Sequence, residues 1–327
     1  MGYTFMTTGD ERTLKRWSSS NGFVISSTYA RTGTYSFYAY GAYYYLRKSI
    51  TPTATPPYMR ACFLNPSAGA VTFQFREASI VHFYLELNWD SGQIRVMCSS
   101  GVVLGVLQAN LTAKVWYCVE VRGSISDTTG TCVIRLNGEE RLNLANVDTR
   151  NGGTGLCDNV LVVYTTNVPI YVDDVAFRDD TWPGVKGIYL VPVTAAAGVQ
   201  EWSASAGTPA ACVDEVPATF TDYIYRDSLE TGDQHEFAQA GIPDLNYLEI
   251  GGIGVVAYGK LASAGSGALK ATYYDPANAG GDASAAVALD TSGVYVDDYW
   301  LTDANGAPFT RASIGQLYLG VQVGAAP

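Results

Sequence analysis

Residues 132–144 have the sequence CVIRLNGEERLNL, in which two runs of alternating apolar and polar residues flank the pair Asn137-Gly138. Asn and Gly both tolerate positive φ, which a two-residue hairpin turn requires. Successive side chains of a strand point to opposite faces, so each run predicts a strand with one buried face. The segment therefore predicts an antiparallel hairpin.

The same alternation continues on both sides of this hairpin. Residues 35–46 predict a strand pair that turns at Gly41, and further strands are expected near 58–64, 70–76, 80–89, 93–98, 101–107, 114–123, 131–136, 139–144, 159–164 and 169–177. About ten short strands with no helical periodicity between them predict an all-β, antiparallel two-sheet sandwich. A parallel α/β sheet is excluded because it needs crossover helices.

Composition predicts a second domain. The chain has 327 residues, enough for two cores, and its character changes to Ala-, Gly- and Asp-rich sequence after residues 178–184. We therefore expect a first domain at residues 1–180, a linker at 181–187 and an acidic, smaller β-sandwich at 188–327. Strands are expected there near 187–193, 210–216, 247–259, 268–274, 284–289 and 314–323, with a helical turn within 226–241.

Charge is distributed unevenly between these parts. Residues 1–180 contain 15 basic and 15 acidic side chains, whereas residues 181–327 contain 5 and 16 and account for the net charge of -11. Nucleic-acid binding needs clustered Lys and Arg, and anionic lipid repels acidic surfaces, so neither partner is expected. No apolar run reaches the ~20 residues of a membrane span, and residues 1–17 lack the apolar core of a signal peptide.

Six cysteines offer two interpretations, buried free thiols or disulfides. They are Cys62, Cys98, Cys118, Cys132, Cys157 and Cys212. None has the CxxC spacing of zinc or redox sites, and most lie in apolar, strand-like runs. Free thiols that pack as small hydrophobes are the preferred expectation.

Two sets of residues are candidate binding sites. Asp173 and Asp174 offer carboxylates for Ca²⁺, or acceptors for backbone N–H groups at a sheet corner. Neighbouring strand residues point to opposite faces, so only one of the two is expected to face any given site. A Tyr-rich segment offers aromatic faces either to a glycan or to a subunit interface. Its members are Tyr35, Tyr38, Tyr40, Tyr43, Tyr44 and Tyr45.

No catalytic set is expected. His82 and His235 are the only histidines, and neither accompanies a nucleophile motif. Glu86, Asn88 and Asp90 lie at the period of two that would place them on one strand face, yet the central Asn interrupts the carboxylate pair that glycoside hydrolysis requires. We therefore expect a protein that binds and assembles without catalysis, and that needs no cofactor apart from the Ca²⁺ weighed above.

Two stretches resemble LamG-like jelly rolls of the concanavalin A-like class. Residues 28–41, TYARTGTYSFYAYG, resemble their opening strand, and residues 171–180, YVDDVAFRDD, resemble their closing strand. Beyond them, the order of further motifs is similar to a pattern in two-domain phage structural proteins. These motifs are Trp182-Pro183-Gly184, Leu190 with Pro192, Glu201-Trp202, Asp214-Glu215 with Pro217, and Leu319-Gly320-Val321.

The resemblance implies a virion surface protein of a tailed phage, made in the host cytoplasm. Such a protein is a capsid decoration, head fibre or tail-associated component, which binds capsid or tail proteins and forms a homo-oligomer. The alternative is a carbohydrate-binding adhesion module for attachment to a host or to glycans.

Overall fold

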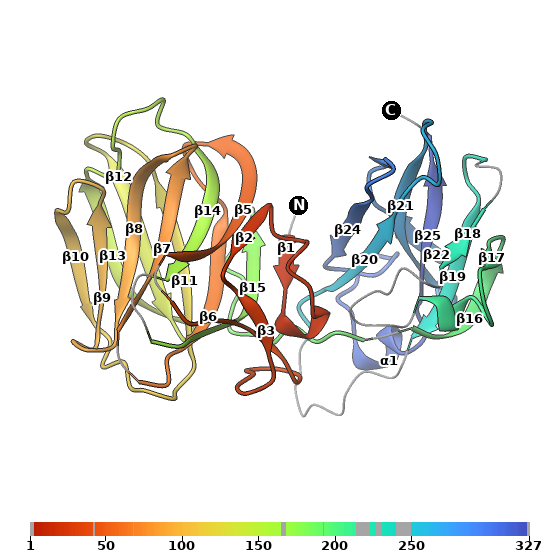
Figure 1. Cartoon of the computed structure of the whole chain (residues 1–327), viewed down its shortest axis with the longest axis horizontal. Coiled ribbons are helices and arrows are strands. Elements are labelled where there is room, and N and C mark those ends of the chain that lie inside the picture. Colours follow the sequence, from red (N-terminus) through yellow and green to blue (C-terminus); the bar gives the residue numbers. More distant parts are fainter. Residues whose placement is uncertain are drawn as a thin grey trace. The chain divides into compact units, whose positions relative to one another are not determined.

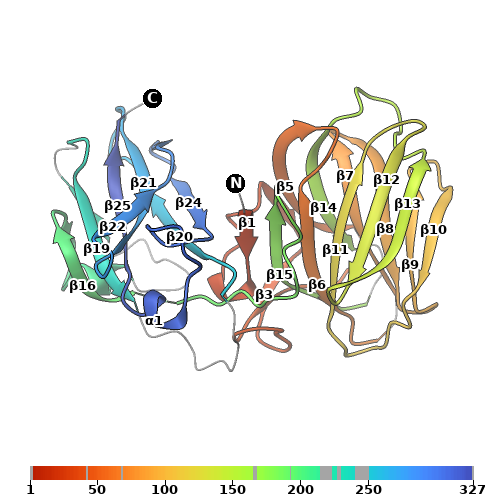
Figure 2. The ribbon, with the colours of Figure 1, turned by 180° about the vertical axis from the view of Figure 1, so that it is seen from behind.

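The protein is almost entirely β-structure in a computed structural model (Figures 1 and 2), which describes residues 3–41, 43–67, 69–164, 168–191, 193–213, 223–226, 230–239 and 250–325. The motif residues Pro192, Asp214, Glu215 and Pro217 lie outside these ranges. The chain divides into two compact units, Tyr3–Tyr189 and Leu190–Pro327. Within the described ranges, no helix has the length and apolar character to cross a membrane.

The first unit is a jelly-roll sandwich of two antiparallel sheets, which confirms the predicted fold class. The eight-stranded sheet has the order β13 (Glu139–Val147), β12 (Gly130–Leu136), β11 (Tyr117–Ser124), β6 (Tyr58–Leu64), β15 (Ile170–Arg178), β4 (Ser36–Ala39) and β3 (Val24–Ser26), with β1 (Tyr3–Thr7) also paired to β15. The seven-stranded sheet has the order β10 (Val103–Gln108), β9 (Gln93–Cys98), β8 (Ile80–Asn88), β7 (Ala70–Glu77), β14 (Cys157–Tyr164), β5 (Tyr44–Thr53) and β2 (Ser19–Asn21).

Alternating apolar side chains from both sheets fill the space between them. On β8, Phe83, Leu85 and Leu87 are fully buried, and the Phe83 ring stacks on Phe75 of β7 with centroids 4.4 Å apart. The predicted hairpin joins β12 to β13, with φ of 52° at Asn137 and 89° at Gly138. Residues 35–46 depart from expectation, because β4 and β5 belong to different sheets and do not pair.

Two cysteines form a disulfide that the sequence did not lead us to expect. Cys62 of β6 and Cys118 of β11 lie directly opposite in the strand register, and their sulfur atoms are bonded. The expectation of free thiols was wrong for this pair because strand register, which sequence spacing does not specify, sets the two side chains against one another. It is confirmed for the other four, Cys98, Cys132, Cys157 and Cys212, which are buried and free.

Residues 183–188 lie against the outer face of the eight-stranded sheet. Arg60, 1% exposed, donates from Nε to the Asp174 carbonyl at 2.9 Å and from Nη1 to the carbonyls of Gly184 and Lys186, each at 2.6 Å. Glu120, the cross-strand neighbour of Arg60, accepts the Gly184 N–H at 2.6 Å. Burial lowers the pKa of Arg60 and raises that of Glu120. These contacts cover this part of the face.

The second unit is a smaller sandwich. Its six-stranded sheet has the order β16 (Val193–Gln200), β19 (Gln234–Gln239), β25 (Tyr318–Gly324), β21 (Ala268–Asp275) and β22 (Gly280–Ala283), with β23 (Val287–Ala288) paired to β21. The pair β20 (Ile253–Gly259) and β24 (Val294–Trp300) packs on it through Val255, Val296 and Trp300. The remaining elements of its described residues are the strand pair β17 (Ser203–Ala204) and β18 (Ile224–Tyr225), the 3₁₀ turn Ala210–Cys212 and the helix α1 (Arg311–Ile314).

Sequence-based expectations for this unit were less accurate than for the first. Residues 234–239 form β19 where a helical turn was expected, and Ala210–Cys212 form a 3₁₀ turn where a strand was expected. Strand β24 was not anticipated. Polar Gln234, buried His235 and polar Glu236 in β19 conceal the apolar alternation that identifies strands elsewhere.

Replacing both bonded cysteines, in Cys62→Ala/Cys118→Ala, should lower the free energy of unfolding by about 2–4 kcal/mol, because the bond restricts the unfolded chain. Urea denaturation with and without dithiothreitol provides the measurement. Reductant should destabilise the native protein and leave the double variant unchanged. Equal responses to reductant would show that the bond does not form.

Arg60→Met should lower the free energy of unfolding by about 3–5 kcal/mol, since the carbonyls of Asp174, Gly184 and Lys186 lose their donor and Glu120 loses its cationic neighbour. Amide hydrogen exchange at Gly184 and Ile188 should accelerate together with this loss. Exposed Arg141 is the control, and Arg141→Met should change stability by less than about 0.5 kcal/mol. Unchanged exchange at Gly184 in Arg60→Met would contradict the role assigned to Arg60.

Candidate functional site

The outer face of the seven-stranded sheet carries a band of polar side chains. On β8, the residues that alternate with the buried Phe83, Leu85 and Leu87 are Tyr84, Glu86 and Asn88. Thr72 and Gln74 of β7 lie opposite Glu86 and Tyr84, and Arg95 of β9 lies opposite Glu86 on the other side. The strand period thus places hydroxyl, amide, carboxylate and guanidinium groups side by side.

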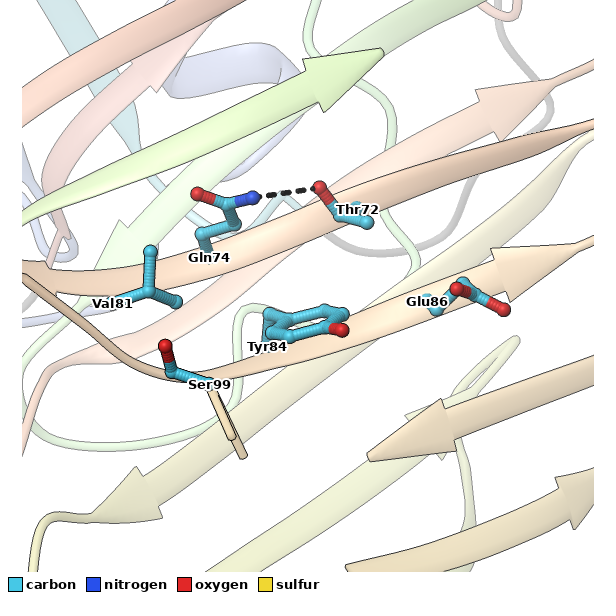
Figure 3. Close-up of a pocket in the computed structure, with 6 residues that line it drawn as sticks. All are labelled: Thr72, Gln74, Val81, Tyr84, Glu86 and Ser99. Carbon is cyan, nitrogen blue, oxygen red and sulfur yellow. Dashed lines mark hydrogen bonds between the residues drawn. The ribbon is translucent and has the colours of Figure 1, made fainter. Parts of the chain in front are cut away.

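A shallow hollow of about 380 Å³ lies within this band (Figure 3). Its lining residues are Thr72, Gln74, Val81, Tyr84, Glu86 and Ser99. Tyr84 is the one aromatic side chain among them. Figure 3 shows Tyr84 and Glu86 projecting from one strand and Gln74 and Thr72 from its neighbour.

Hydrogen bonds position the polar lining groups. Gln74 Nε2 donates to Thr72 Oγ1 at 3.1 Å. Glu86 Oε1 accepts from Asn88 Nδ2 at 3.4 Å and lies 3.6 Å from Arg95 Nη1. Burial, followed by the negative charge of Glu86, raises the pKa of Tyr84. The phenol is therefore a neutral hydroxyl at pH 7, able both to donate and to accept.

The Tyr-rich segment does not form a single surface. Tyr38 belongs to β4 in the eight-stranded sheet, where its ring lies 4.9 Å from that of Tyr171, whereas Tyr44 and Tyr45 belong to β5 in the seven-stranded sheet. Tyr40 and Tyr43 are 58% and 77% exposed between these strands, and the Arg12 guanidinium lies over the ring of Tyr35. The glycan or interface role of these six residues stays a prediction.

Asp173 and Asp174 both contact the segment Arg31–Thr32, contrary to simple strand alternation. A bulge in β15 and a φ of 49° at Asp174 turn the two side chains toward this segment. Asp173 accepts the Arg31 N–H at 3.0 Å and the Thr8 hydroxyl at 2.7 Å. Asp174 accepts the Thr32 hydroxyl at 2.7 Å and pairs with the Arg31 guanidinium.

Protein donors thus occupy both carboxylates of this pair. Burial and the adjacent Asp174 charge raise the pKa of Asp173 to about 7. Across the described ranges, no group of three or more His, Cys, Asp or Glu side chains is arranged to hold a metal ion. Calcium binding at this pair stays a prediction, and the observed contacts are those of the alternative role, acceptors at a sheet corner.

The residues weighed for catalysis lie apart from one another. His82 is buried, with Nδ1 accepting the Asn151 N–H and Nε2 near the Leu156 carbonyl, each at 3.3 Å. His235 is buried in the second unit, where burial lowers its pKa. Glu86 lines the hollow, but Asp90 follows the end of β8 in an exposed turn. Glu86 is the one carboxylate of the lining, whereas general acid and base work on a glycosidic bond needs two.

Sequence reasoning missed Tyr84, Gln74 and Thr72 as candidate site residues. Tyr84 precedes Glu86 and Asn88 at the same period of two in the sequence, but only Glu86, Asn88 and Asp90 were considered, as a possible carboxylate series. Its neighbour Gln74 and the opening of this face to solvent depend on strand pairing across 10 residues and more.

No protein-family model matches the chain, and no curated protein matches it. Solved structures do. The chain is similar to Caenorhabditis elegans galectin LEC-6, with 11% identity over 43% of this chain and 94% of that one and a TM-score of 0.31. It is similar to a Bacillus subtilis protein of unknown function with a galectin-like fold, with 10% identity over 55% and 96% of the two chains and a TM-score of 0.39.

A third similar structure is domain 4 of AbnA, a GH43 extracellular arabinanase of Geobacillus stearothermophilus solved with arabinotriose. It has 11% identity over 54% of this chain and 92% of that one, with a TM-score of 0.35. Likenesses of this degree identify neither an activity nor a ligand.

Proposed function

We propose that the first unit is a carbohydrate-binding module and that the hollow around Tyr84 is its binding site. The observation that carries this proposal is the juxtaposition of one partly exposed aromatic ring with the polar groups of Thr72, Gln74 and Glu86 in an open depression. A sugar ring has an apolar face and a rim of hydroxyls. The Tyr84 ring suits the face, and the amide, hydroxyl and carboxylate suit the rim.

The lining residues can bind a sugar without catalysing its hydrolysis. Sugar hydroxyls both donate and accept, and Gln74 offers both functions from one planar group. Glu86, held by Asn88 and Arg95, acts as a fixed acceptor. A site with a single carboxylate binds a glycan without supplying the acid and base pair that hydrolysis needs.

The virion location implied by the phage resemblance, with its capsid or tail partners and homo-oligomer, remains a separate proposal. A glycan-binding module is compatible with that location, since attachment to a host surface requires adhesion. The contacts around Tyr84 support the binding of glycans.

Tyr84→Ala should weaken binding to the preferred glycan by about tenfold, equivalent to about 1.4 kcal/mol, because the sugar loses its stacking surface. A glycan microarray would identify ligands, and isothermal titration calorimetry would compare affinities. Tyr84→Phe, which keeps the ring, should retain most of the binding. Tyr223→Ala, which removes an exposed tyrosine of the second unit, is the matched control and should bind as the native protein does.

Tyr43→Ala distinguishes the hollow from the Tyr-rich segment. If glycan binding is lost in this variant and preserved in Tyr84→Ala, the site has been placed on the wrong surface. Absence of binding to every glycan on a broad array would reject the proposed function itself.

A further inference from the structure

Two arginines lie beside the hollow on the same face of the seven-stranded sheet. Leu161 of β14 pairs with Arg47 of β5 on one side and with Gln74 of β7 on the other. Arg76 follows two residues after Gln74 and lies opposite Val81, which lines the hollow. The two guanidinium groups therefore flank β14 next to the proposed sugar site.

Neither arginine has an ion-pair partner among the described residues, although several other arginines of this unit do. Arg16, Arg31, Arg95, Arg150 and Arg178 each contact a carboxylate within 4 Å. The Nε atoms of Arg47 and Arg76 are buried and have no hydrogen-bond partner. Within the described part of the chain, the one hydrogen bond of either guanidinium joins Arg76 Nη2 to the Ser79 carbonyl at 2.7 Å.

Polar side-chain atoms around these two arginines also lack hydrogen-bond partners among the described residues. Burial lowers the pKa of Arg76, the positive charge of Arg47 lowers it further, and Asp158 partly offsets both effects. The Asp158 carboxylate already accepts the Ala78 N–H at 2.9 and 3.0 Å. Ser19, whose cross-strand partner is Arg47, has a buried hydroxyl oxygen without a partner, and so has the amide oxygen of Asn159, opposite Arg76.

Native proteins leave few buried polar atoms without partners, and such groups call for a specific explanation. Here three of them that can donate a hydrogen bond, the two Nε groups and the Ser19 hydroxyl, share one region of one face, together with two like charges that repel each other. An oxyanion between the guanidinium groups would accept from both and offset their repulsion. Arginine suits this task, because its planar fork matches carboxylate, sulfate and phosphate geometry.

We propose that Arg47 and Arg76 form an oxyanion subsite and that the ligand of the hollow is an acidic glycan. This inference rests on the proposed function and names its substrate class. Tyr84 and Arg47 lie three strands apart, which is roughly 14 Å between backbones. The ligand is therefore an oligosaccharide, with one ring on Tyr84 and a carboxylate, sulfate or phosphate substituent on a neighbouring unit.

The test compares ligands that differ in charge alone. Isothermal titration calorimetry at low ionic strength would measure binding of an oligogalacturonate, its carboxyl-reduced neutral counterpart and a sulfated derivative of that counterpart. The native protein should bind the better acidic ligand at least tenfold more tightly than the neutral one. The stronger of the two acidic arms identifies the oxyanion.

Arg47→Gln and Arg76→Gln should each weaken acidic binding about tenfold and leave neutral binding unchanged. Arg141→Gln, on exposed β13 of the other sheet, removes the same charge and should change neither. Equal affinity for acidic and neutral ligands, with neutral binding still lost in Tyr84→Ala, would overturn this inference and leave the proposed function standing. An equal loss of affinity for acidic ligands in Arg141→Gln would show that only the overall charge matters, and this too would overturn the inference.

A ligand-free measurement separates an oxyanion site from a structural role. If the arginines serve a ligand, replacing either relieves repulsion, so the melting temperature of the free protein should stay the same or rise. A fall in melting temperature for both variants would show that Arg47 and Arg76 stabilise the fold, and would contradict the oxyanion subsite. In a thermal-shift assay, sulfate or glucuronate should raise the melting temperature of the native protein relative to chloride. Neither anion should raise that of the Arg47→Gln variant.

Discussion

The contacts of Arg60 hold in place the segment that covers part of the outer face of the eight-stranded sheet. Its guanidinium bonds the carbonyls of Asp174, Gly184 and Lys186, and with Glu120 it fixes residues 183–188 on the outer face of the eight-stranded sheet. A buried cation without such acceptors would be strongly destabilising, so the covering segment and the arginine depend on each other. The opposite sheet has no comparable cover over β7, β8 and β9 among the described residues, and there the hollow forms.

The open face shows the difference between satisfied and unsatisfied polar groups. Glu86 accepts a hydrogen bond from Asn88 and forms an ion pair with Arg95. Gln74 donates to Thr72, so these side chains are positioned before a ligand binds. Among the described residues, Arg47 and Arg76 have no carboxylate within ion-pair distance, their Nε groups have no hydrogen-bond partner, and their charges repel. Preorganised acceptors beside uncompensated donors are the arrangement expected of a site that completes its hydrogen bonds with a ligand.

The first unit was predictable from sequence to a large degree because its information is local. The runs at 58–64, 93–98 and 159–164 became β6, β9 and most of β14, and Asn137-Gly138 formed the turn that its backbone preferences dictate. The second unit was less predictable. Strand β19 buries His235, Glu236 and Phe237 in succession, so neither its sequence nor its burial follows the period of two that identifies strands elsewhere.

By itself, the sequence determined that the chain forms antiparallel strands, where most strands of the first unit lie, and which side chains of each strand share a face. All of this follows from the pleat of the strand and from turn residues close in sequence. Only the tertiary structure decided that Cys62 meets Cys118, that Tyr38 lies on one sheet and Tyr44 and Tyr45 on the other, and that Arg47 lies near Arg76. These facts depend on pairing and register between distant segments, which are settled by the packing of whole sheets and by long-range hydrogen bonds.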